Sequence, residues 1–204
     1  MANFVKEYLE HGKILDNLED IIIGKSPLDK YNLRQLFLGE GMFAFVSWRW
    51  LHPFADWVGD RKVLEVMAGR GWLAHGLRQL NVDVKATDDY SWINEKGWKE
   101  PLVDIEDLDA VKSIEVYGSD VDIVIMSWPW MDSTAYRVLR KLHEVNSDAI
   151  LVYIGEPLGG CTADDSFFDH FEEIEDDWFT NNVSVNLESW DGIYDDVFLG
   201  TYKQ

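Results

Sequence analysis

A turn with two spaced glycines joins an apolar run to a helical pattern in VLEVMAGRGWLA, residues 63–74. The run at 62–66 has the composition of a buried parallel strand, and leucines at helical spacing follow the turn. Gly69 and Gly71 let the backbone turn tightly and approach a ligand, and the start of the helix exposes unpaired N–H groups. The segment therefore predicts a nucleotide-like ligand at the carboxyl edge of a sheet.

The flanking sequence alternates strand and helix patterns. Apolar runs predict further buried strands, and helical periodicity lies between them, with Asp132 or Ser133 as the cap of one helix. This alternation predicts an α/β fold, a Rossmann-like, mostly parallel sheet with helices on both faces. The predicted strands after the glycine turn are residues 83–87, 121–126 and 149–154.

The two ends of the chain differ from this pattern. Residues 182–187 and 195–202 alternate around a turn at Asp191-Gly192, which predicts a C-terminal antiparallel hairpin. The acidic stretch 164–177 is typical of a solvated amphipathic helix. Helical spacing within residues 1–58 predicts an N-terminal helical lid or extension, so the main domain would cover residues 59–204.

Two carboxylates narrow the choice of ligand. Asp88 lies nineteen residues beyond Gly69, where an acid binds ribose hydroxyls in dinucleotide folds as well. Glu65 lies inside the first strand, where a dinucleotide fold has an apolar residue. A carboxylate buried there needs a partner, and a ligand ammonium group would supply one. Dinucleotide binding and a turn that only packs strand on helix remain the alternatives.

Residues 65–71 resemble the first motif of class I S-adenosylmethionine-dependent methyltransferases, and the resemblance extends over residues 61–202. It implies S-adenosylmethionine (SAM) as cofactor, with Asp88 on the ribose hydroxyls and residues 103–105 at the adenine. Met67 departs from the family pattern, which often has glycine there. The cofactor-binding residues that the resemblance implies are Glu65, Ala68, Gly69, Gly71, Asp88, Asp104 and Ile105.

A second motif follows the strongest strand. Ser127-Trp128-Pro129-Trp130 resembles the fourth motif of amino-methyltransferases, in which a polar residue precedes Pro-Pro and an aromatic residue. The resemblance implies that Ser127 and a prolyl carbonyl accept hydrogen bonds from a target amine, while the aromatic ring stacks on a flat acceptor. Trp128 stands where that family has proline. The other interpretation is a tight turn packed by tryptophans.

A glycine-rich loop at residues 153–162 contains Glu156 and follows another predicted strand. Together with the Ser-Trp-Pro segment, it resembles a group of methyltransferase-like proteins that have Ser-Trp-Pro-Pro, then Gly-Glu and a Gly-Thr-rich loop. Loops at this edge line the active site in open α/β sheets. We therefore expect Glu156 to orient the acceptor or act as a base, or alternatively to cap a helix.

The composition restricts the partners. A net charge of −20 disfavours nucleic acid and favours a small molecule or a protein as acceptor. The single cysteine, Cys161, excludes an internal disulfide, and the scattered histidines predict no metal site. The sequence has neither a membrane-length apolar run nor the pattern of a signal peptide, so we expect a cytoplasmic protein without membrane association.

These observations predict a SAM-dependent methyltransferase that transfers a methyl group to an amino nitrogen of an acceptor that the sequence does not identify. Two alternatives remain open at this point. One is a catalytically inactive module that binds SAM or a partner protein through its acidic surface. The other is an enzyme that cleaves SAM.

Overall fold

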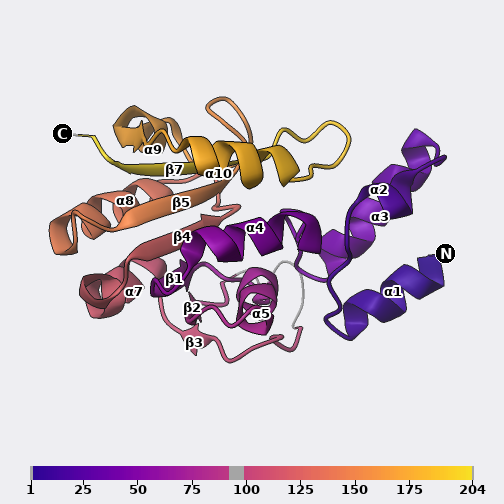
Figure 1. Ribbon diagram of the computed structural model, residues 1–204, viewed down its shortest axis with the longest axis horizontal. Coiled ribbons are helices and arrows are strands. Elements are labelled where there is room, and N and C mark those ends of the chain that lie inside the picture. Colours follow the sequence, from indigo (N-terminus) through magenta and orange to yellow (C-terminus); the bar gives the residue numbers. More distant parts are fainter. Residues whose placement is uncertain (1, 92–98, 204) are drawn as a thin grey trace.

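The computed structural model describes residues 2–91 and 99–203, whose strands form one seven-stranded sheet (Figure 1). The strands are Val63–Val66 (β1), Val84–Asp88 (β2), Glu106–Asp107 (β3), Ile123–Ser127 (β4), Ile150–Gly155 (β5), Phe171–Glu173 (β6) and Asp196–Tyr202 (β7). Their order is β3-β2-β1-β4-β5-β7-β6; β1 to β5 are parallel, and β7 is antiparallel to both of its neighbours. The predicted Rossmann-like, mostly parallel α/β sheet is confirmed.

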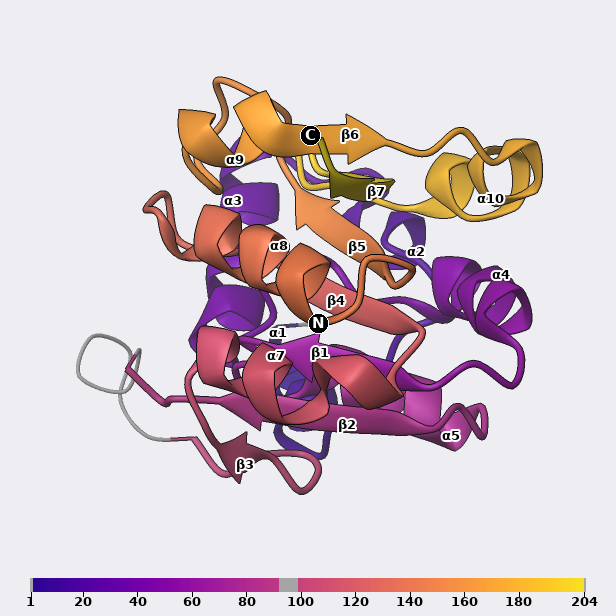
Figure 2. The same cartoon turned by 90° about the vertical axis from the view of Figure 1, so that its left-hand side faces the viewer.

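Helices cover both faces of this sheet (Figure 2). They are Ala2–Glu10 (α1), Glu19–Ile22 (α2), Pro27–Gly39 (α3), Trp48–Val58 (α4), Trp72–Gln79 (α5), Ala110–Tyr117 (α7), Thr134–Val145 (α8), Asp165–His170 (α9) and Asp177–Asn182 (α10). Side chains alternate between the two cores: Ile123 and Ile125 of β4 pack with α4, α5 and α10, whereas Val124 and Met126 pack with α7, α8 and α9. Both faces of the parallel strands are therefore buried, which explains their continuous apolar runs.

The C-terminal hairpin is present, but one of its strands is not the predicted one. β7 pairs with β6, whereas residues 182–187 lie at the end of α10 and in the 3₁₀ turn Ser184–Asn186. β6 comes from the acidic stretch that we expected to be a single helix; Asp164 caps α9 by accepting from the Phe167 amide, and the chain turns extended at Phe171. The alternation of apolar and polar residues at 182–187 did not produce a strand. Asp176 caps α10 by accepting from the Phe179 amide, and the helix continues to Asn182.

The N-terminal extension is helical in its described part, as expected, with four helices joined by loops. α3 begins with Ser26 as its cap and Pro27 in its first turn, a common start of a helix. α3 ends at Gly39 and α4 begins at Trp48, so residues 40–47 form a loop. Trp50 and Phe54 of α4 are fully buried in the core on one face of the sheet. This packing fixes the loop over the carboxyl edge.

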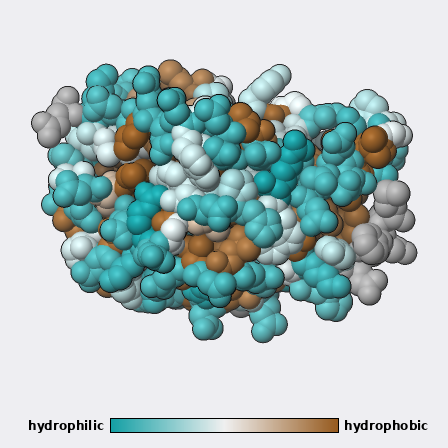
Figure 3. Space-filling view, in the orientation of Figure 1, coloured by the Kyte–Doolittle hydropathy of each residue, from teal (hydrophilic) through white to brown (hydrophobic). Residues whose placement is uncertain are grey.

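The face in Figure 3 is mostly hydrophilic, with brown apolar patches between teal side chains. None of the helices in the described ranges has both the length and the apolar character of a membrane span.

Candidate functional site

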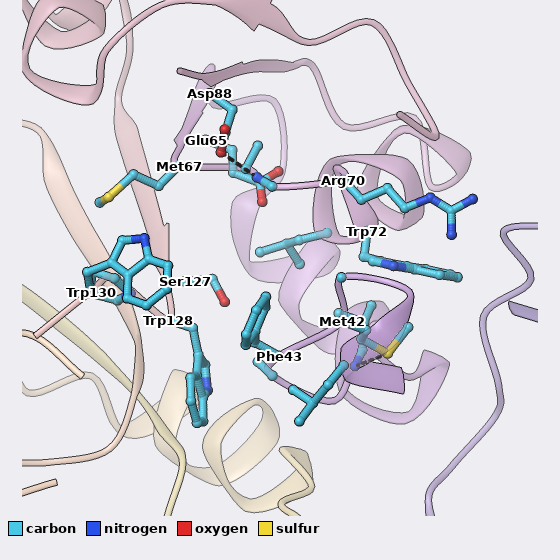
Figure 4. A pocket seen from close by; sticks show the side chains of 18 of the residues that line it. Met42, Phe43, Glu65, Met67, Arg70, Trp72, Asp88, Ser127, Trp128 and Trp130 are labelled. Atoms are coloured by element: carbon cyan, nitrogen blue, oxygen red, sulfur yellow. Dashed lines mark hydrogen bonds between the residues drawn. The ribbon is translucent and has the colours of Figure 1, made fainter. Parts of the chain in front are cut away.

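A cavity opens at the carboxyl ends of β1, β2 and β4, beneath the loop between α3 and α4 (Figure 4). Parallel strands bring their ends to this edge, which is where open α/β sheets bind ligands. The cavity brings together residues from both predicted groups. From the cofactor group these are Glu65, Ala68, Gly69 and Asp88, and from the acceptor group Ser127, Trp128, Pro129 and Trp130.

The two glycines of the turn have different roles. Both have left-handed backbones, with φ of +59° at Gly69 and +83° at Gly71. A Cβ on Gly69 would meet no atom within 4 Å, so this glycine opens toward the cavity. A Cβ on Gly71 would lie 2.9 Å from a methyl carbon of Val103, so this glycine allows close packing instead. Gly71 is not part of the cavity lining, and its cofactor contact stays a prediction.

Met67 shares the left-handed conformation. Its φ is +55°, in a region that costs a side chain free energy and that glycine adopts easily. The left-handed backbone explains why glycine suits this position in the methyltransferase motif that residues 65–71 resemble. The Met67 side chain lies on the cavity wall (Figure 4).

Asp88 ends β2 with a carboxylate held by the backbone. Its Oδ2 accepts from the Gly69 amide at 2.7 Å, and its Oδ1 accepts from the Tyr90 amide at 2.7 Å. The residue is 4% exposed and lines the cavity. Two backbone amides therefore hold this hydrogen-bond acceptor at the cavity.

Glu65 lies deeper at the cavity floor. It is 2% exposed, and its Oε2 accepts from the Ala74 amide at 2.9 Å. Burial raises the pKa of this carboxyl to about 8; the charge of Asp88 raises the pKa as well, and the Ala74 hydrogen bond opposes the shift. The protein thus supplies one partner, where we expected only the ligand to do so. A cation in the cavity would favour the ionised form.

The predicted adenine segment lies beside the turn and outside the cavity lining. Ile105 packs against Gly71, and its carbonyl accepts from the Tyr90 hydroxyl at 3.2 Å. Asp104 is exposed, and its carbonyl accepts from the Arg78 guanidinium at 3.4 Å. Neither side chain contributes to the cavity wall, so the cofactor contacts of Asp104 and Ile105 stay predictions.

The opposite wall is aromatic. Trp128 lies 6.0 Å from Phe43 between ring centres, and Trp130 is 49% exposed at the rim (Figure 4). Trp128 has a φ of +52°, which proline cannot adopt because its ring fixes φ near −65°. The Pro129 carbonyl accepts from the Ala163 amide at 3.4 Å. The loop therefore differs in backbone from a Pro-Pro motif, although Ser127 still lines the cavity.

Glu156 does not line the cavity. Its Oε2 accepts from the Cys161 amide at 2.8 Å, and its Oε1 accepts from the Tyr194 amide at 3.1 Å. The hydrogen bond from the Cys161 thiol is the main cause that lowers the pKa of this carboxyl. Glu156 thus holds two loops together, and its expected role at the acceptor gains no support from this geometry.

An ion-pair cluster that the sequence did not reveal ties the N-terminal segment to the glycine turn. Glu40 Oε2 lies 2.6 Å from the Arg70 guanidinium, and Oε1 lies 2.8 Å from the Lys99 ammonium. The Glu40 carbonyl also accepts from the Trp72 indole at 2.7 Å. Both Glu40 and Arg70 are buried. The partners of Glu40 lie 30 and 59 residues away in the chain, so no local sequence pattern predicts this contact.

Comparison with known proteins identifies the fold. No protein-family model and no curated sequence matches the chain. Among solved structures, a TehB-like SAM-dependent methyltransferase from Corynebacterium glutamicum superposes with a TM-score of 0.50 at 14% identity, over 87% of this chain and 100% of the other. Magnesium protoporphyrin IX methyltransferase from Synechocystis PCC 6803 with bound SAM gives 0.51 at 12% identity, over 99% and 96%.

The chain has the fold of class I SAM-dependent methyltransferases. In this methyltransferase fold, the antiparallel β7 inserted between β5 and β6 completes the sheet. The glycine turn follows β1, and Asp88 ends β2, at the edge where the cavity opens.

Proposed function

We propose that this protein is a SAM-dependent methyltransferase that acts on a flat, uncharged acceptor. The observation that carries the proposal is that one cavity joins the glycine turn and its two acids to an aromatic wall. Bound SAM would supply a methyl group on a positively charged sulfur. Glu65 and Asp88 offer carboxylates to the ammonium and ribose hydroxyls, and Gly69 leaves room for close approach.

The charges along the cavity support this choice of acceptor. Among the described residues, the charged ones that line the cavity all come from residues 65–99; they are Glu65, Arg70, Asp88, Asp89 and Lys99. The lining from residues 38–46 and 127–134 has aromatic, apolar and small polar side chains instead. An ion would lose its hydration there without a charged partner, so an uncharged, flat group fits best.

The amino nitrogen that the sequence suggested has weaker support. The φ of Trp128 is incompatible with the proline of the resembling motif, and the Pro129 carbonyl already accepts from Ala163. The Ser127 hydroxyl remains the polar group on this wall that lies next to the end of β4. We infer that Ser127 orients the acceptor atom by a hydrogen bond, and that positioning supplies much of the rate.

We also infer that residues 1–58 serve as a lid for the main domain, residues 59–204. Met42 and Phe43 cover the cavity, and Glu40 fastens this loop to Arg70. A lid that excludes water strengthens electrostatic interactions inside the site.

The test is transfer from tritiated SAM to a panel of neutral flat amines, phenols and indoles, with polyamines as charged controls. Mass spectrometry of the cofactor product separates the alternatives: adenosylhomocysteine (SAH) indicates transfer, and methylthioadenosine indicates cleavage. We expect SAH with at least one neutral acceptor, and no transfer by Trp130→Ala although that variant still binds SAH. SAM binding without any product would support the inactive module instead.

A further inference from the structure

Three buried polar groups converge behind the aromatic wall. They are the Arg34 Nε of α3, the Trp128 indole Nε1 and both carboxylate oxygens of Asp195, and none has a well-formed hydrogen bond to the described residues. The Arg34 guanidinium carbon lies 6.0 Å from the centre of the Trp128 ring. Buried polar groups are normally paired, so a cluster of unpaired ones beside a cavity points to a function.

Trp128 is also strained in its backbone. A φ of +52° is unfavourable for so bulky a residue, and the hydrogen bond from its amide to the Ile154 carbonyl, at 2.8 Å, holds the loop on β5. The ring lines the cavity beside Phe43. This conformation presents one edge of the indole to Asp195, while the ring forms part of the wall.

Asp195 is fixed from both sides. Glu156 accepts from the amide of the preceding residue, Tyr194, at 3.1 Å, and the Ser189 hydroxyl donates to the Asp195 carbonyl at 3.0 Å. Asp195 itself does not line the cavity, because its carboxylate lies behind Trp128. Trp128 therefore lies in the lining and contacts Asp195, so it can transmit the position of this carboxylate to a bound molecule.

We propose that Asp195 is a positioning residue whose ionised carboxylate accepts a hydrogen bond from the Trp128 indole and so fixes that ring in the acceptor wall. The inference rests on the proposed function, because it takes the Trp128 wall to be the acceptor side. The proposal adds a residue outside the cavity lining to the residues that position the acceptor.

The charges around Asp195 make the contact sensitive to pH. Burial raises the pKa of Asp195 to about 7; Glu156 and Asp196 raise the pKa too, whereas Trp128 and Arg34 lower it. The pKa of the neighbouring Cys161 thiol is raised to about 11 by burial, and burial also raises the pKa of the Tyr153 hydroxyl. Between pH 6 and 8, Asp195 is therefore the group in this cluster that changes charge.

The experiment follows the ¹⁵N-labelled indole N–H signals of the full chain between pH 3 and 9, with Trp128→Phe used to assign the Trp128 signal. We expect that signal to move with a midpoint near pH 7, and to stop moving in Asp195→Asn. Trp57 is a matched control in the same spectrum, because its indole donates to Asp176 at 3.0 Å. Hydrogen bonds, first the one from the Phe179 amide, lower the pKa of Asp176, so the Trp57 signal should move only in acid.

A Trp128 signal that is constant from pH 5 to 9 in the unmodified protein would overturn the proposal, as would one that still titrates in Asp195→Asn. The titration of the unmodified protein does not depend on whether Asp195→Asn folds. The Asp195→Asn variant should bind SAH as the unmodified protein does, and it should raise the KM of a productive acceptor roughly fivefold. If the unmodified protein does not bind SAH, that result counts against the proposed function. The pH titration of the Trp128 indole signal can still be measured in that case.

Discussion

The Gly69 amide donates to the Asp88 carboxylate at 2.7 Å, across nineteen residues of chain. This hydrogen bond joins the turn after β1 to the end of β2, so one carboxylate both shapes the glycine turn and faces the cavity. The two sequence signals that suggested a nucleotide-like ligand are therefore one structural unit.

Asp88→Ala should weaken SAM and SAH binding roughly 100-fold, because hydrogen bonds to a charged group contribute about 3 kcal/mol together. Isothermal titration calorimetry measures the change. Asp104→Ala is the matched control, since Asp104 is an exposed acid outside the cavity lining, and it should bind as the unmodified protein does. Equal loss in both variants would contradict the assignment.

Glu65→Gln should change how stability depends on pH. The folded-state pKa of Glu65, about 8, lies above its unfolded value of 4.5. The stability that this group contributes is therefore full below pH 4.5 and is lost as the pH rises to 8. Urea unfolding without SAM should give equal stabilities near pH 4.5, and a variant more stable by a few kcal/mol at pH 9, at about 1.4 kcal/mol per pKa unit.

The same Glu65→Gln variant should bind SAM more weakly at pH 9, because the amide carries no charge for the ammonium group. A variant that is no more stable than the unmodified protein at pH 9 would show that Glu65 ionises without cost in the cavity.

Met67 offers a test of the turn itself. Because its φ is +55°, Met67→Gly should be more stable than Met67→Ala by about 1 kcal/mol. At Met126, within strand β4, the order should reverse, with alanine more stable than glycine. Thermal unfolding of the four variants measures both differences. The turn has another conformation if alanine is the better residue at position 67.

The Glu40 cluster should stabilise the closed lid. Glu40→Leu leaves the buried Arg70 charge unpaired and should cost about 3 kcal/mol, and the double variant with Arg70→Leu should recover much of that loss. Lys99→Ala should cost below about 1 kcal/mol, because its side chain is 40% exposed. Chemical denaturation measures these variants together with Arg70→Leu alone; losses of the two single variants that add up in the double variant would exclude the pairing.

The sequence predicted the sheet and much of the cavity because both depend on local patterns. Apolar runs gave the parallel strands, and the spacing from Gly69 to Asp88 placed a turn and an acid at one edge. The prediction of a strand at 182–187 was wrong. Caps at Asp164 and Asp176 start the helices α9 and α10, and the three residues of β6 between these helices pair with β7 instead.

Contacts between distant residues could not be predicted in the same way. The ion pair of Glu40 and Arg70 and the approach of Asp195 to Trp128 depend on the packing of separate elements. Glu156 was expected at the acceptor because its loop follows β5 at the correct edge, but its carboxylate turns back to bind two loop amides. Edge position alone does not tell whether a side chain faces the cavity.

The central claim is that this cavity binds SAM. Calorimetric titration of the unmodified protein with SAM, SAH and NAD tests it most directly. We expect micromolar binding of SAM and SAH, loss of both in Asp88→Ala, and no heat from NAD. Binding of NAD alone, or of none of the three by the folded protein, would contradict the account.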